Sequence, residues 1–486
     1  MKPVTYYSTN NKLEVVDFQT ALLKGMASNY GLYMMDRKDI PKLSLQQIKE
    51  MAHLSYAQIA FMVLNPFLTS EIPSQKLEAL LEDAYNKDKI PTQVDFVKGK
   101  THIMWLTKGP TYSFKDYAAR FFGRTLNYFL GEKNLKRTVM VATSGDTGGA
   151  VADALHGLNN VENIVFFPKD SISAGQRRQM TTLHKNIYAF EVNGDFDVCQ
   201  ALIKTLLGDK KFAGEIFKDE ERFTSANSIS IGRLLPQAVY PFFAYSKIAE
   251  NGEPMITSVP SGNFGDMMGT LIAKEMGLPI SSIVCGVNEN TAFPDFLETG
   301  EYVVKATKHS PSSAMNVSHP SNLARLVDFY GGHMYDERDM VSKKVIRDGV
   351  IDIMPDLKAM KKDIISVGVT NSEHYQTIQD VYVPFNIILD PHGAVGWRAL
   401  QKVLGWRNNK LSVVYETADP GKFPEDIHKA INIFPDLPEG MKKQAKAKER
   451  IYSIISEPER TPEGKLKLSE MQIEEAKSTI RKIFSI

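Results

Sequence analysis

A lysine stands where a helix is expected to begin, in the stretch KGPTYSFKDYAARFF at residues 108–122. Lys115 follows a Gly-Pro-Thr turn and precedes a helical run of residues. A cation in the first turn of a helix faces the positive end of the helix dipole, which costs about 0.3–1 kcal/mol at an exposed site. An amine that gives up its proton readily suits this position, and such an amine can form a Schiff base with an aldehyde.

The residues around the lysine predict how it is fixed. Ser113 is placed to cap the helix, and Asp116 is placed to be the acid of a capping box of the S-x-x-D type. This pattern predicts that Lys115 lies in the first turn, close to the helix dipole.

Three glycine-containing turns follow three expected strands. They read TSGDTGG at 143–149, PSGNFGD at 260–266 and ETADPGKF at 416–423. Small residues let backbone N–H groups approach a ligand closely, and a turn that opens a helix adds its dipole, which suits phosphate or carboxylate. None of them is a dinucleotide fingerprint or a P-loop, so nucleotide-binding classes lose support.

The lysine and the turns point to one kind of cofactor when they are taken together. Pyridoxal 5′-phosphate needs an amine for its aldehyde, N–H donors for its phosphate and a partner for its ring nitrogen. A single turn of this kind is commonly only a tight turn, so the combination carries the inference rather than any one motif.

The elements that position these residues alternate between short apolar runs and amphipathic stretches. Alternation of this kind predicts an open α/β fold with a mainly parallel sheet, in which ligands bind at the carboxyl ends of the strands. Residues 14–95 are expected to be mostly helical. The expected strands are 138–143, 163–168, 186–192, 255–260, 281–287, 385–390 and 411–417.

Composition excludes several classes of protein. The 486 residues carry 58 Lys and Arg against 57 Asp and Glu, so the net charge of +1 favours neither nucleic acid nor a membrane surface as partner. Cys199 and Cys285 match no zinc spacing, and we expect buried thiols and no metal. The start MKPVTYYSTNN has no apolar signal region, and no apolar run could span a membrane, so a cytoplasmic protein is expected.

Ten motifs in order resemble one family, the threonine synthases of the longer, fungal and bacterial type within the fold-type II pyridoxal-phosphate enzymes. The motifs are YYSTNN followed by GLYM, GPTYSFKDYAARF, TSGDTGGAVA, FFPKDSISAGQRRQM, NGDFDVCQ, SANSISIGRLLPQAVY, VPSGNFGDMMG, PSNLARL, LDPHGAVG and ETADPGKF. The resemblance runs from the N-terminus to about residue 425.

The resemblance implies an α/β fold of the tryptophan synthase β type, with two open, mainly parallel α/β domains and a helical N-terminal region. It implies a helix-rich domain at 1–95 and a catalytic region at 96–420, in which a smaller subdomain at about 130–240 closes over the site. Residues 421–486 are expected to form a C-terminal helical segment.

The resemblance also implies a role for individual residues. Lys115 would form the Schiff base with the cofactor and then shuttle protons. A first group would receive the substrate carboxylate and face the cofactor ring, namely Ser144, Gly145, Asp146 and Thr147. A second group would bind the cofactor, with Gly262, Asn263, Phe264 and Gly265 around its phosphate and Thr417 at its ring nitrogen. Asn227, Ser228 and Arg233 would bind the substrate phosphate, with Lys169 and Gln176 as weaker candidates. A structural ion pair is an equally good reading of Arg233.

The implied reaction converts O-phospho-L-homoserine and water to L-threonine and phosphate, the last step of threonine biosynthesis. The alternatives are a related phospho-lyase that gives a 2-oxo acid, ammonia and phosphate, and a cofactor-binding protein without catalysis. We expect a small-molecule substrate, no nucleic-acid or membrane partner, and a monomer or homodimer.

Six positions differ from the common family pattern, beginning with Asn10 and Asn11, where Arg and Gly are common. His is common at position 108 and at position 419, where this chain has Lys108 and Asp419. Asn is common at position 266 and Thr at position 393, where it has Asp266 and Gly393. An inward-pointing carboxylate would repel a phosphate, so we expect the Asp266 side chain to turn away from the cofactor loop.

Overall fold

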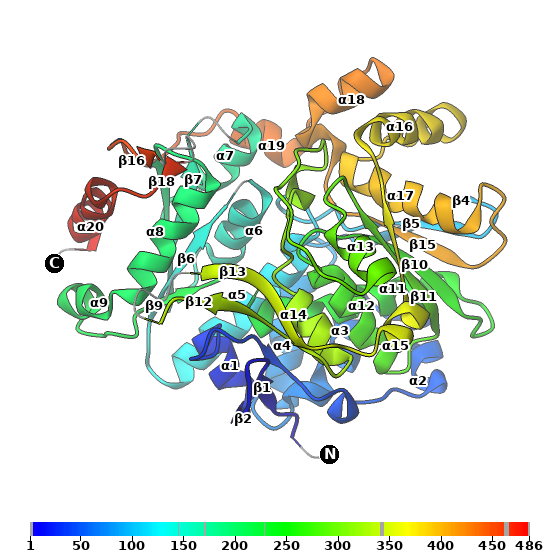
Figure 1. The fold of residues 1–486 in the computed structure, drawn as a ribbon, viewed down its shortest axis with the longest axis horizontal. Coiled ribbons are helices and arrows are strands. Elements are labelled where there is room, and N and C mark those ends of the chain that lie inside the picture. The colour runs from blue at the N-terminus through cyan, green and yellow to red at the C-terminus, as the bar shows by residue number, and fades with distance from the viewer. Residues whose placement is uncertain are drawn as a thin grey trace. The chain divides into compact units, whose positions relative to one another are not determined.

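The computed structural model describes residues 3–143, 145–169, 172–227, 229–340, 345–460 and 466–484. The chain divides into two compact units, each described here by itself. The first unit comprises Met1–Ala118 and Ser228–Asp436, and the second comprises Ala119–Asn227 and Leu437–Ile486. Figure 1 shows the elements of both units along the chain.

A six-stranded sheet forms the centre of the first unit, in the order β14-β11-β10-β15-β5-β4. All neighbouring pairs are parallel except β4 with β5. The strands β10 and β15 are buried along their whole length, which is why they consist mostly of apolar and small residues with little alternation, apart from Glu416 at the end of β15. The strands are β4 (Gln93–Lys98), β5 (Thr101–Trp105), β10 (Met255–Pro260), β11 (Ile280–Val287), β14 (Ile364–Gly368) and β15 (Ser412–Glu416).

Several helices pack on this sheet, two of them on its central strands. The helix α17 (Pro391–Leu404) packs on β10, β11, β14 and β15, and α12 (Gly265–Glu275) packs on β10 and β11. A Cβ atom at Gly286 would lie 3.1 Å from Val395 and Ala399, so the glycine lets α17 approach the strand closely. The two helices also flank these strands in Figure 1.

The N-terminal residues add a small antiparallel sheet and four helices to the first unit. The sheet has the order β2 (Asn11–Val16), β1 (Tyr6–Ser8) and β3 (Tyr33–Met34). The helices are α1 (Phe18–Lys24), α2 (Leu45–Glu50), α3 (Tyr56–Leu68) and α4 (Ser74–Tyr85). Ser44 and Ser55 close capping boxes at the starts of α2 and α3, which fixes where these helices begin.

The rest of the first unit consists of short helices and one hairpin. The hairpin joins β12 (His333–Arg338) and β13 (Val345–Ile353). The helices are α10 (Ile231–Leu234), α11 (Val239–Ile248), α13 (Ala292–Thr299), α14 (Leu323–Phe329), α15 (Leu357–Asp363), α16 (Asn371–Phe385) and α18 (Pro424–Ile431).

The second unit has a fully parallel five-stranded sheet in the order β16-β8-β7-β6-β9. The strands are β6 (Arg137–Ala142), β7 (Val161–Pro168), β8 (Ile187–Val192), β9 (Phe223–Ser225) and β16 (Ile451–Ile454), with a separate pair β17 (Glu459–Arg460) and β18 (Leu466–Lys467). The helices are α6 (Asp146–Leu155), α7 (Ala174–Thr181), α8 (Phe196–Gly208), α9 (Lys210–Phe217), α19 (Glu439–Gln444) and α20 (Glu470–Phe484). The helix α5 (Lys115–Glu132) begins in the first unit and ends in the second.

The predicted parallel α/β organisation is confirmed, with two corrections. Residues 385–390 are not a strand, because Phe385 ends α16, Asn386 adopts a left-handed conformation and the following residues pair with no strand. Leu389 is buried there, so these residues are apolar because the segment packs in the core, although it forms no hydrogen-bonded pair with a strand. The helical expectation for residues 421–486 misses β16, which lies at the edge of the second sheet.

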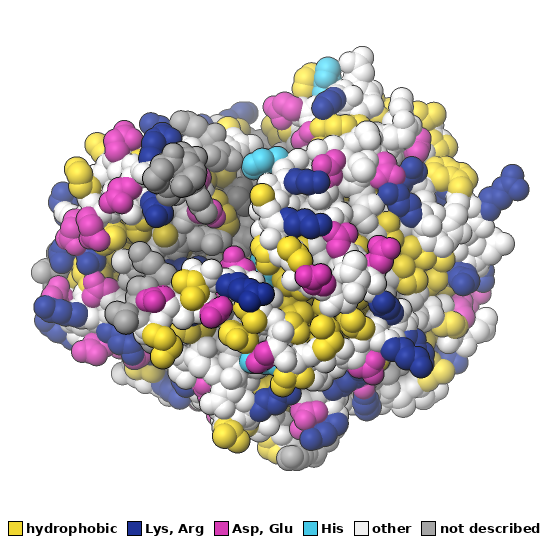
Figure 2. Space-filling model, viewed as in Figure 1, with side chains coloured by type: hydrophobic (Ala, Val, Ile, Leu, Met, Phe, Trp, Pro, Cys, Tyr) yellow, Lys and Arg dark blue, Asp and Glu magenta, His cyan; other side chains and the backbone are white. Residues whose placement is uncertain are grey.

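Two negative findings apply to the described part of the chain. No helix there is long and apolar enough to cross a membrane. No group of three or more His, Cys, Asp or Glu side chains there could hold a metal ion. Figure 2 shows acidic and basic side chains interspersed on the visible face, in keeping with the net charge of +1.

Candidate active site

Three neighbouring strands of the first unit bring the predicted cofactor residues together. The strands β10, β15 and β5 lie side by side and run parallel, so their carboxyl ends meet at one edge of the sheet. The turn at 261–265 follows β10, Thr417 follows β15, and Lys115 lies ten residues beyond the end of β5. The edge that the sequence predicted therefore carries all three features.

Lys115 is the first residue of α5, as predicted, and it lies next to the chain around Thr417. The N–H of Phe114 donates to the carbonyl oxygen of Thr417 at 2.9 Å, and Ser113 forms an antiparallel bridge with Ala418. This pairing holds the lysine segment against the segment expected at the cofactor ring nitrogen.

The predicted capping box at Ser113 is wrong. The Ser113 hydroxyl is buried and has no hydrogen-bond partner within the described residues. Asp116 instead turns back to Thr111, accepting from its N–H at 2.9 Å and from its hydroxyl at 2.6 Å. The acid braces the Gly-Pro-Thr turn, and a Cβ at Gly109 would lie only 2.4 Å from Asp116 Oδ2.

Buried aromatic rings fix the helix just beyond the lysine. The ring of Tyr117 lies 5.1 Å from that of Tyr56 on α3 and 6.3 Å from that of Tyr240 on α11. The hydroxyl of Tyr85, at the end of α4, donates to the carbonyl of Tyr117 at 2.7 Å. The N-terminal helices thus hold the start of α5 in place, which limits the motion of Lys115 to its own side chain.

The turn at 262–265 leaves its backbone donors unused. The N–H groups of Gly262, Asn263, Phe264 and Gly265 donate to no acceptor in the part of the chain that the structure describes. Phe264 has φ of 62° and α12 begins directly after it, so the turn opens the helix. Unpaired donors at a helix N-terminus form a binding site for an anion such as phosphate.

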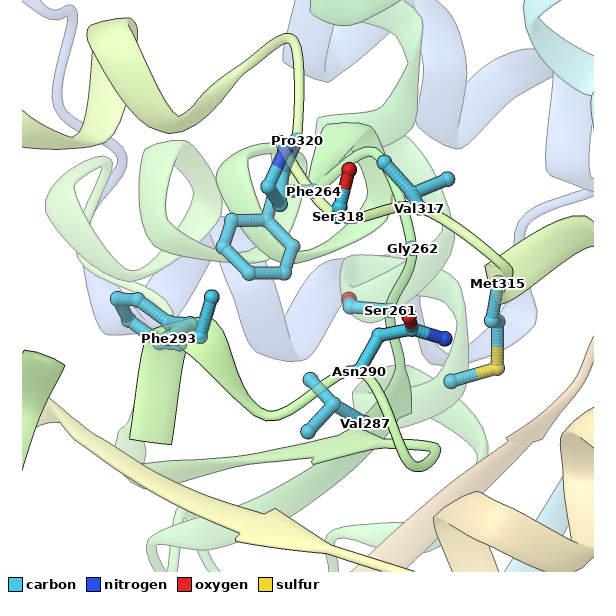
Figure 3. A pocket seen from close by; sticks show the side chains of 11 residues that line it. Ser261, Gly262, Phe264, Val287, Asn290, Phe293, Met315, Val317, Ser318 and Pro320 are labelled. Carbon is cyan, nitrogen blue, oxygen red and sulfur yellow. The ribbon is translucent and has the colours of Figure 1, made fainter. Parts of the chain in front are cut away.

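Close packing explains why position 262 is glycine. A Cβ there would lie 2.9 Å from the carbonyl oxygen of Ala314 and from the Cα of Met315. Figure 3 shows the recess beside this turn, where the rings of Phe264 and Phe293 lie next to each other, with centroids 4.9 Å apart. The segment around residue 315 therefore limits how far the turn can move.

Asp266 turns its carboxylate onto the preceding loop. Its Oδ1 accepts from the hydroxyl of Ser261 at 2.8 Å and from the N–H of Met267 at 2.9 Å. Burial raises the pKa of Asp266 to about 6, although the charge of Lys115 acts in the opposite direction. The carboxylate therefore supports the start of the turn at Ser261.

A buried chain of acids and a histidine lies beside Thr417. Glu416 Oε1 accepts from the N–H of Asp390, and Asp390 Oδ1 contacts His392 Nδ1, each at 2.5 Å. His392 Nε2 accepts from the N–H of Ala314 at 3.1 Å, which requires the ring proton on Nδ1. This chain therefore supports the segment that packs on Gly262.

The charge states of this chain follow from its burial. Burial raises the pKa of Glu416 well above its usual range, and the neighbouring Asp390 adds to the rise. The pKa of Asp390 is lowered because His392 outweighs the effect of burial on it. A Cβ at Gly393 would lie 1.6 Å from Glu416 Oε2, which explains why Thr, common there in the family, is absent.

Thr417 itself is 4% exposed, and its hydroxyl makes no hydrogen bond within the described residues. A free hydroxyl beside Lys115 and the open turn matches the chemistry that a pyridine nitrogen requires. The lysine, the unpaired donors and this hydroxyl together fit a phosphorylated aldehyde with a ring nitrogen.

The predicted residues for the substrate phosphate are only partly placed. Arg233 on α10 is 4% exposed. Burial lowers the pKa of Arg233 to about 10, and Asp116 partly opposes that fall. Asn227 is partly buried, and Ser228 lies outside the described residues.

The remaining predicted residues belong to the second unit. Ser144 lies outside the described residues, Gly145 has φ of 142°, and α6 begins at Asp146, followed by Thr147. Gln176, a weaker candidate for the substrate phosphate, is buried and donates to Asp146 Oδ1 at 3.0 Å. Its side chain therefore supports the loop that opens α6. Lys169 is exposed at the end of β7.

Comparisons with known proteins identify the family of the chain. Family models match residues 5–85 (threonine synthase N terminus), 105–348 (pyridoxal-phosphate dependent enzyme) and 393–461 (threonine synthase, C-terminal). The chain is 33% identical to threonine synthase of Escherichia coli over 440 residues, which is 90% of this chain and 94% of that protein. The chain belongs to the threonine synthase family.

Solved structures give the same result for the fold. The pyridoxal-phosphate-bound threonine synthase of Brucella melitensis matches with a TM-score of 0.85 at 28% identity, over 99% of this chain and 100% of that one. The yeast threonine synthase matches with a TM-score of 0.84 at 28% identity, over 98% of each chain. The fold-type II prediction is confirmed, and the chain is a pyridoxal-phosphate-dependent enzyme.

Sequence reasoning missed several residues that support the site. It assigned no role to Glu416, although this residue stands in the ETADP motif. It assigned no role to any residue of the PSNLARL motif either. In the structure, Arg325 of that motif donates to Asn322, and Asn322 donates to the carbonyl oxygen of Asn263 in the turn at 262–265. The signal in the sequence was a charged residue, an acid or an arginine, inside each of these motifs.

Proposed function

We propose that this enzyme converts O-phospho-L-homoserine and water to L-threonine and phosphate. The observation that carries the proposal is the convergence of Lys115, the four unpaired N–H donors at 262–265 and the Thr417 hydroxyl at one sheet edge. Relatives named threonine synthase, similar over about nine-tenths of the chain, support it.

Pyridoxal phosphate, when bound, supplies an aldehyde carbon for the substrate amine and a ring that spreads negative charge from the substrate carbons. The residues of the chain do the rest. The turn at 262–265 would bind the cofactor phosphate through its N–H groups, and the Thr417 hydroxyl would meet the ring nitrogen. A neutral hydroxyl leaves that nitrogen unprotonated, in contrast to an acidic partner.

Lys115 would hold the cofactor and then move protons. Its amine would take protons from the substrate Cα and Cβ and return protons at Cγ, where phosphate leaves, and at Cα, because one flexible side chain can reach these neighbouring atoms. The anchoring of Asp116 and Tyr117 fixes the backbone directly after Lys115. Asp266 places a counter-charge close to the amine.

The other predicted residues would bind the substrate. Asn227, Ser228 and Arg233 would bind its phosphate, for which the planar fork of Arg233 is suited. Ser144, Gly145 and Thr147 would receive its carboxylate at the start of α6, and Asp146 would face the cofactor. The Arg233 assignment competes with its structural role beside Asp116.

Several properties stay predictions. We propose that the enzyme acts in the cytoplasm at the last step of threonine biosynthesis, as a monomer or homodimer. The expected division of the chain at residues 95 and 420, and the closing of residues 130–240 over the substrate, are also predictions.

The test combines absorption spectroscopy with product analysis. Purified protein should show the visible band of bound cofactor, and addition of O-phospho-L-homoserine should shift the band and release phosphate and threonine in equal amounts. Lys115→Ala should lose the band, and its activity should fall by at least about 1,000-fold, because the Schiff base and the proton transfers both depend on this amine. Lys133→Ala, which changes an exposed lysine just beyond the other end of α5, is the matched control.

Two results would contradict the proposal. Phosphate with ammonia and a 2-oxo acid, but without threonine, would identify a phospho-lyase. Absence of a cofactor band after incubation with pyridoxal phosphate would remove the role of Lys115 altogether.

A further inference from the structure

Arg325 is a fully buried arginine in the first unit that has only neutral partners. It lies on α14 and is 0% exposed. Its guanidinium donates to the carbonyl oxygen of Tyr33 at 3.0 Å, to Asn322 Oδ1 at 2.7 Å and to the carbonyl oxygen of Ile229 at 2.6 Å. All three groups are uncharged acceptors.

No carboxylate pairs with this guanidinium among the residues that the structure describes. Burial lowers the pKa of Arg325 to about 9, and no charged neighbour opposes that fall. A buried charge without a counter-ion is costly to a fold, so a chain that keeps one needs an anion nearby or gains from the field of the charge.

A chain of hydrogen bonds leads from this charge to the cofactor turn. The amide of Asn322, which accepts from Arg325, donates from Nδ2 to the carbonyl oxygen of Asn263 at 2.9 Å. The N–H of Asn322 reaches the same carbonyl at 3.3 Å, and Ser321 donates to Asn263 Oδ1. The turn is therefore held at Asn263, through its backbone carbonyl and its side-chain oxygen.

The geometry of the peptide unit sets where the donors point. In a planar trans peptide the C=O and the N–H point in opposite directions, so an Asn263 carbonyl directed at Asn322 turns the Phe264 N–H away from it. Hydrogen bonds in a chain polarise one another, so the charge of Arg325 strengthens the Asn322 donor and, through the peptide, the Phe264 N–H.

The third partner extends the reach of Arg325 to a second segment. Ile229 follows Asn227 and Ser228, which are the residues proposed for the substrate phosphate. One guanidinium thus fixes the chain beside both phosphate-binding segments.

We propose that Arg325 is a positioning residue that makes the turn at 262–265 selective for a phosphate dianion, acting through Asn322 and the Asn263 carbonyl. The proposal rests on the proposed function, because it takes the turn as the cofactor-phosphate site. Arg325 itself touches neither cofactor nor substrate. It orients the donors and supplies a positive field behind them.

The test compares two ligands that differ only in the phosphate. The full-length chain is freed of cofactor with hydroxylamine, and the dissociation constants of pyridoxal phosphate and pyridoxal are measured by absorption titration. Arg325→Met should weaken pyridoxal phosphate binding by about 10- to 100-fold, the range for losing a charge-assisted hydrogen bond. Pyridoxal binding should change by less than about threefold, since this ligand has no phosphate for the turn to bind.

Three further variants sharpen the comparison. Arg325→Lys keeps the charge and should restore part of the preference for the phosphorylated ligand. Asn322→Asp gives Arg325 a counter-ion and removes the donor to Asn263, so it should lose the preference while keeping the fold even if Arg325→Met does not fold. Arg222→Met is the control, because it removes a buried guanidinium that pairs with Glu162 in the second unit.

The outcomes separate this proposal from the proposed function. Equal loss of pyridoxal phosphate and pyridoxal binding in Arg325→Met and in Asn322→Asp would show a purely structural role and overturn the proposal. An unaltered preference in both variants would overturn it as well. A wild-type chain that binds neither ligand would instead contradict the proposed function.

Discussion

Two loops of similar sequence open helices at strand ends, one in each unit, and they use their backbone groups differently. In the second unit, the hydroxyl of Thr143 accepts from the N–H groups of Gly145 and Gly148, each at 2.9 Å, and donates to the Gly145 carbonyl at 3.0 Å. In the first unit, the N–H groups of residues 262–265 have no acceptor among the described residues.

The acids of the two loops also find their partners in different places. Asp146 accepts from Gln176 of a neighbouring helix, whereas Asp266 turns back to Ser261 of its own loop. The loop of the second unit is closed by the Thr143 side chain, which accepts from two of its N–H groups. The loop at 262–265 is held from outside through the Asn263 carbonyl, and its N–H donors stay available. Glycine content alone therefore does not distinguish an anion site from a tight turn.

The largest expected effect comes from adding one methyl group to the open loop. Gly262→Ala would place a Cβ 2.9 Å from backbone atoms of residues 314 and 315, which have little room to move. Overpacking of about 1–3 kcal/mol should weaken pyridoxal phosphate binding by about 10- to 100-fold, measured by absorption titration.

The matched change in the closed loop is Gly148→Ala, whose Cβ would meet Thr143 Cγ2 at 2.4 Å and Met180 Sδ at 2.5 Å. This variant should lower stability while leaving the cofactor affinity within about threefold of wild type. Gly208→Ala, at the end of α8 with open space around it, serves as a neutral control. If both loop variants lose cofactor binding equally, the contrast between the loops is wrong.

A second prediction breaks the threonine closure of the second-unit loop. Thr143→Val removes the acceptor of two buried N–H groups, so the free energy of unfolding should fall by about 1–3 kcal/mol in urea titrations. Thr143→Ser keeps the hydroxyl and should retain most of the stability. A Val variant as stable as the Ser variant would show that the hydroxyl does not close the loop.

The third prediction concerns the acid of the open loop. Burial raises the pKa of Asp266 from 3.8 to about 6. The folded chain therefore keeps this proton where the unfolded chain has lost it, and the contribution of Asp266 to stability falls as the pH rises from about 4 to 6. Lys115 acts against this shift, while Tyr240 and Tyr415 pack nearby as neutral groups.

Asp266→Asn keeps the acceptor for Ser261 but carries no charge. The variant should be more stable than wild type by about 1–2 kcal/mol at pH 8, and the difference should vanish below pH 4, as measured by urea unfolding across pH. A difference in stability that does not depend on pH would rule out titration of Asp266 as its cause.

The sequence predicted the parts of the molecule that depend on local pattern. Buried parallel strands consist of apolar runs, so β6, β7, β8, β10, β11 and β15 were located to within two residues. The lysine at the start of α5 was found because a helical run follows a Gly-Pro-Thr turn. The run FNIILD was wrongly predicted as a strand. A buried segment that pairs with no strand has the same apolar composition as a buried strand.

Long-range contacts explain what local pattern could not predict. Asp116 was assigned to Ser113, but Thr111 offers it two donors, one of them a backbone N–H. The role of Arg325 depends on Tyr33, which lies almost three hundred residues earlier in the chain. The glycine at position 393 is explained only by the structure, in which the Glu416 carboxylate packs against it.

Cofactor binding at residues 262–265, as proposed above, would make the lifetime of this chain in a cell depend on the supply of its vitamin precursor. A ligand that binds only the folded state stabilises it by about 2.7 kcal/mol at a hundredfold excess over its dissociation constant. A newly made chain that meets its cofactor late spends that interval closer to unfolding, where proteases remove it. Shortage of vitamin B6 should therefore lower the amount of this enzyme as well as its activity, and heterologous expression should improve when pyridoxine is added to the medium.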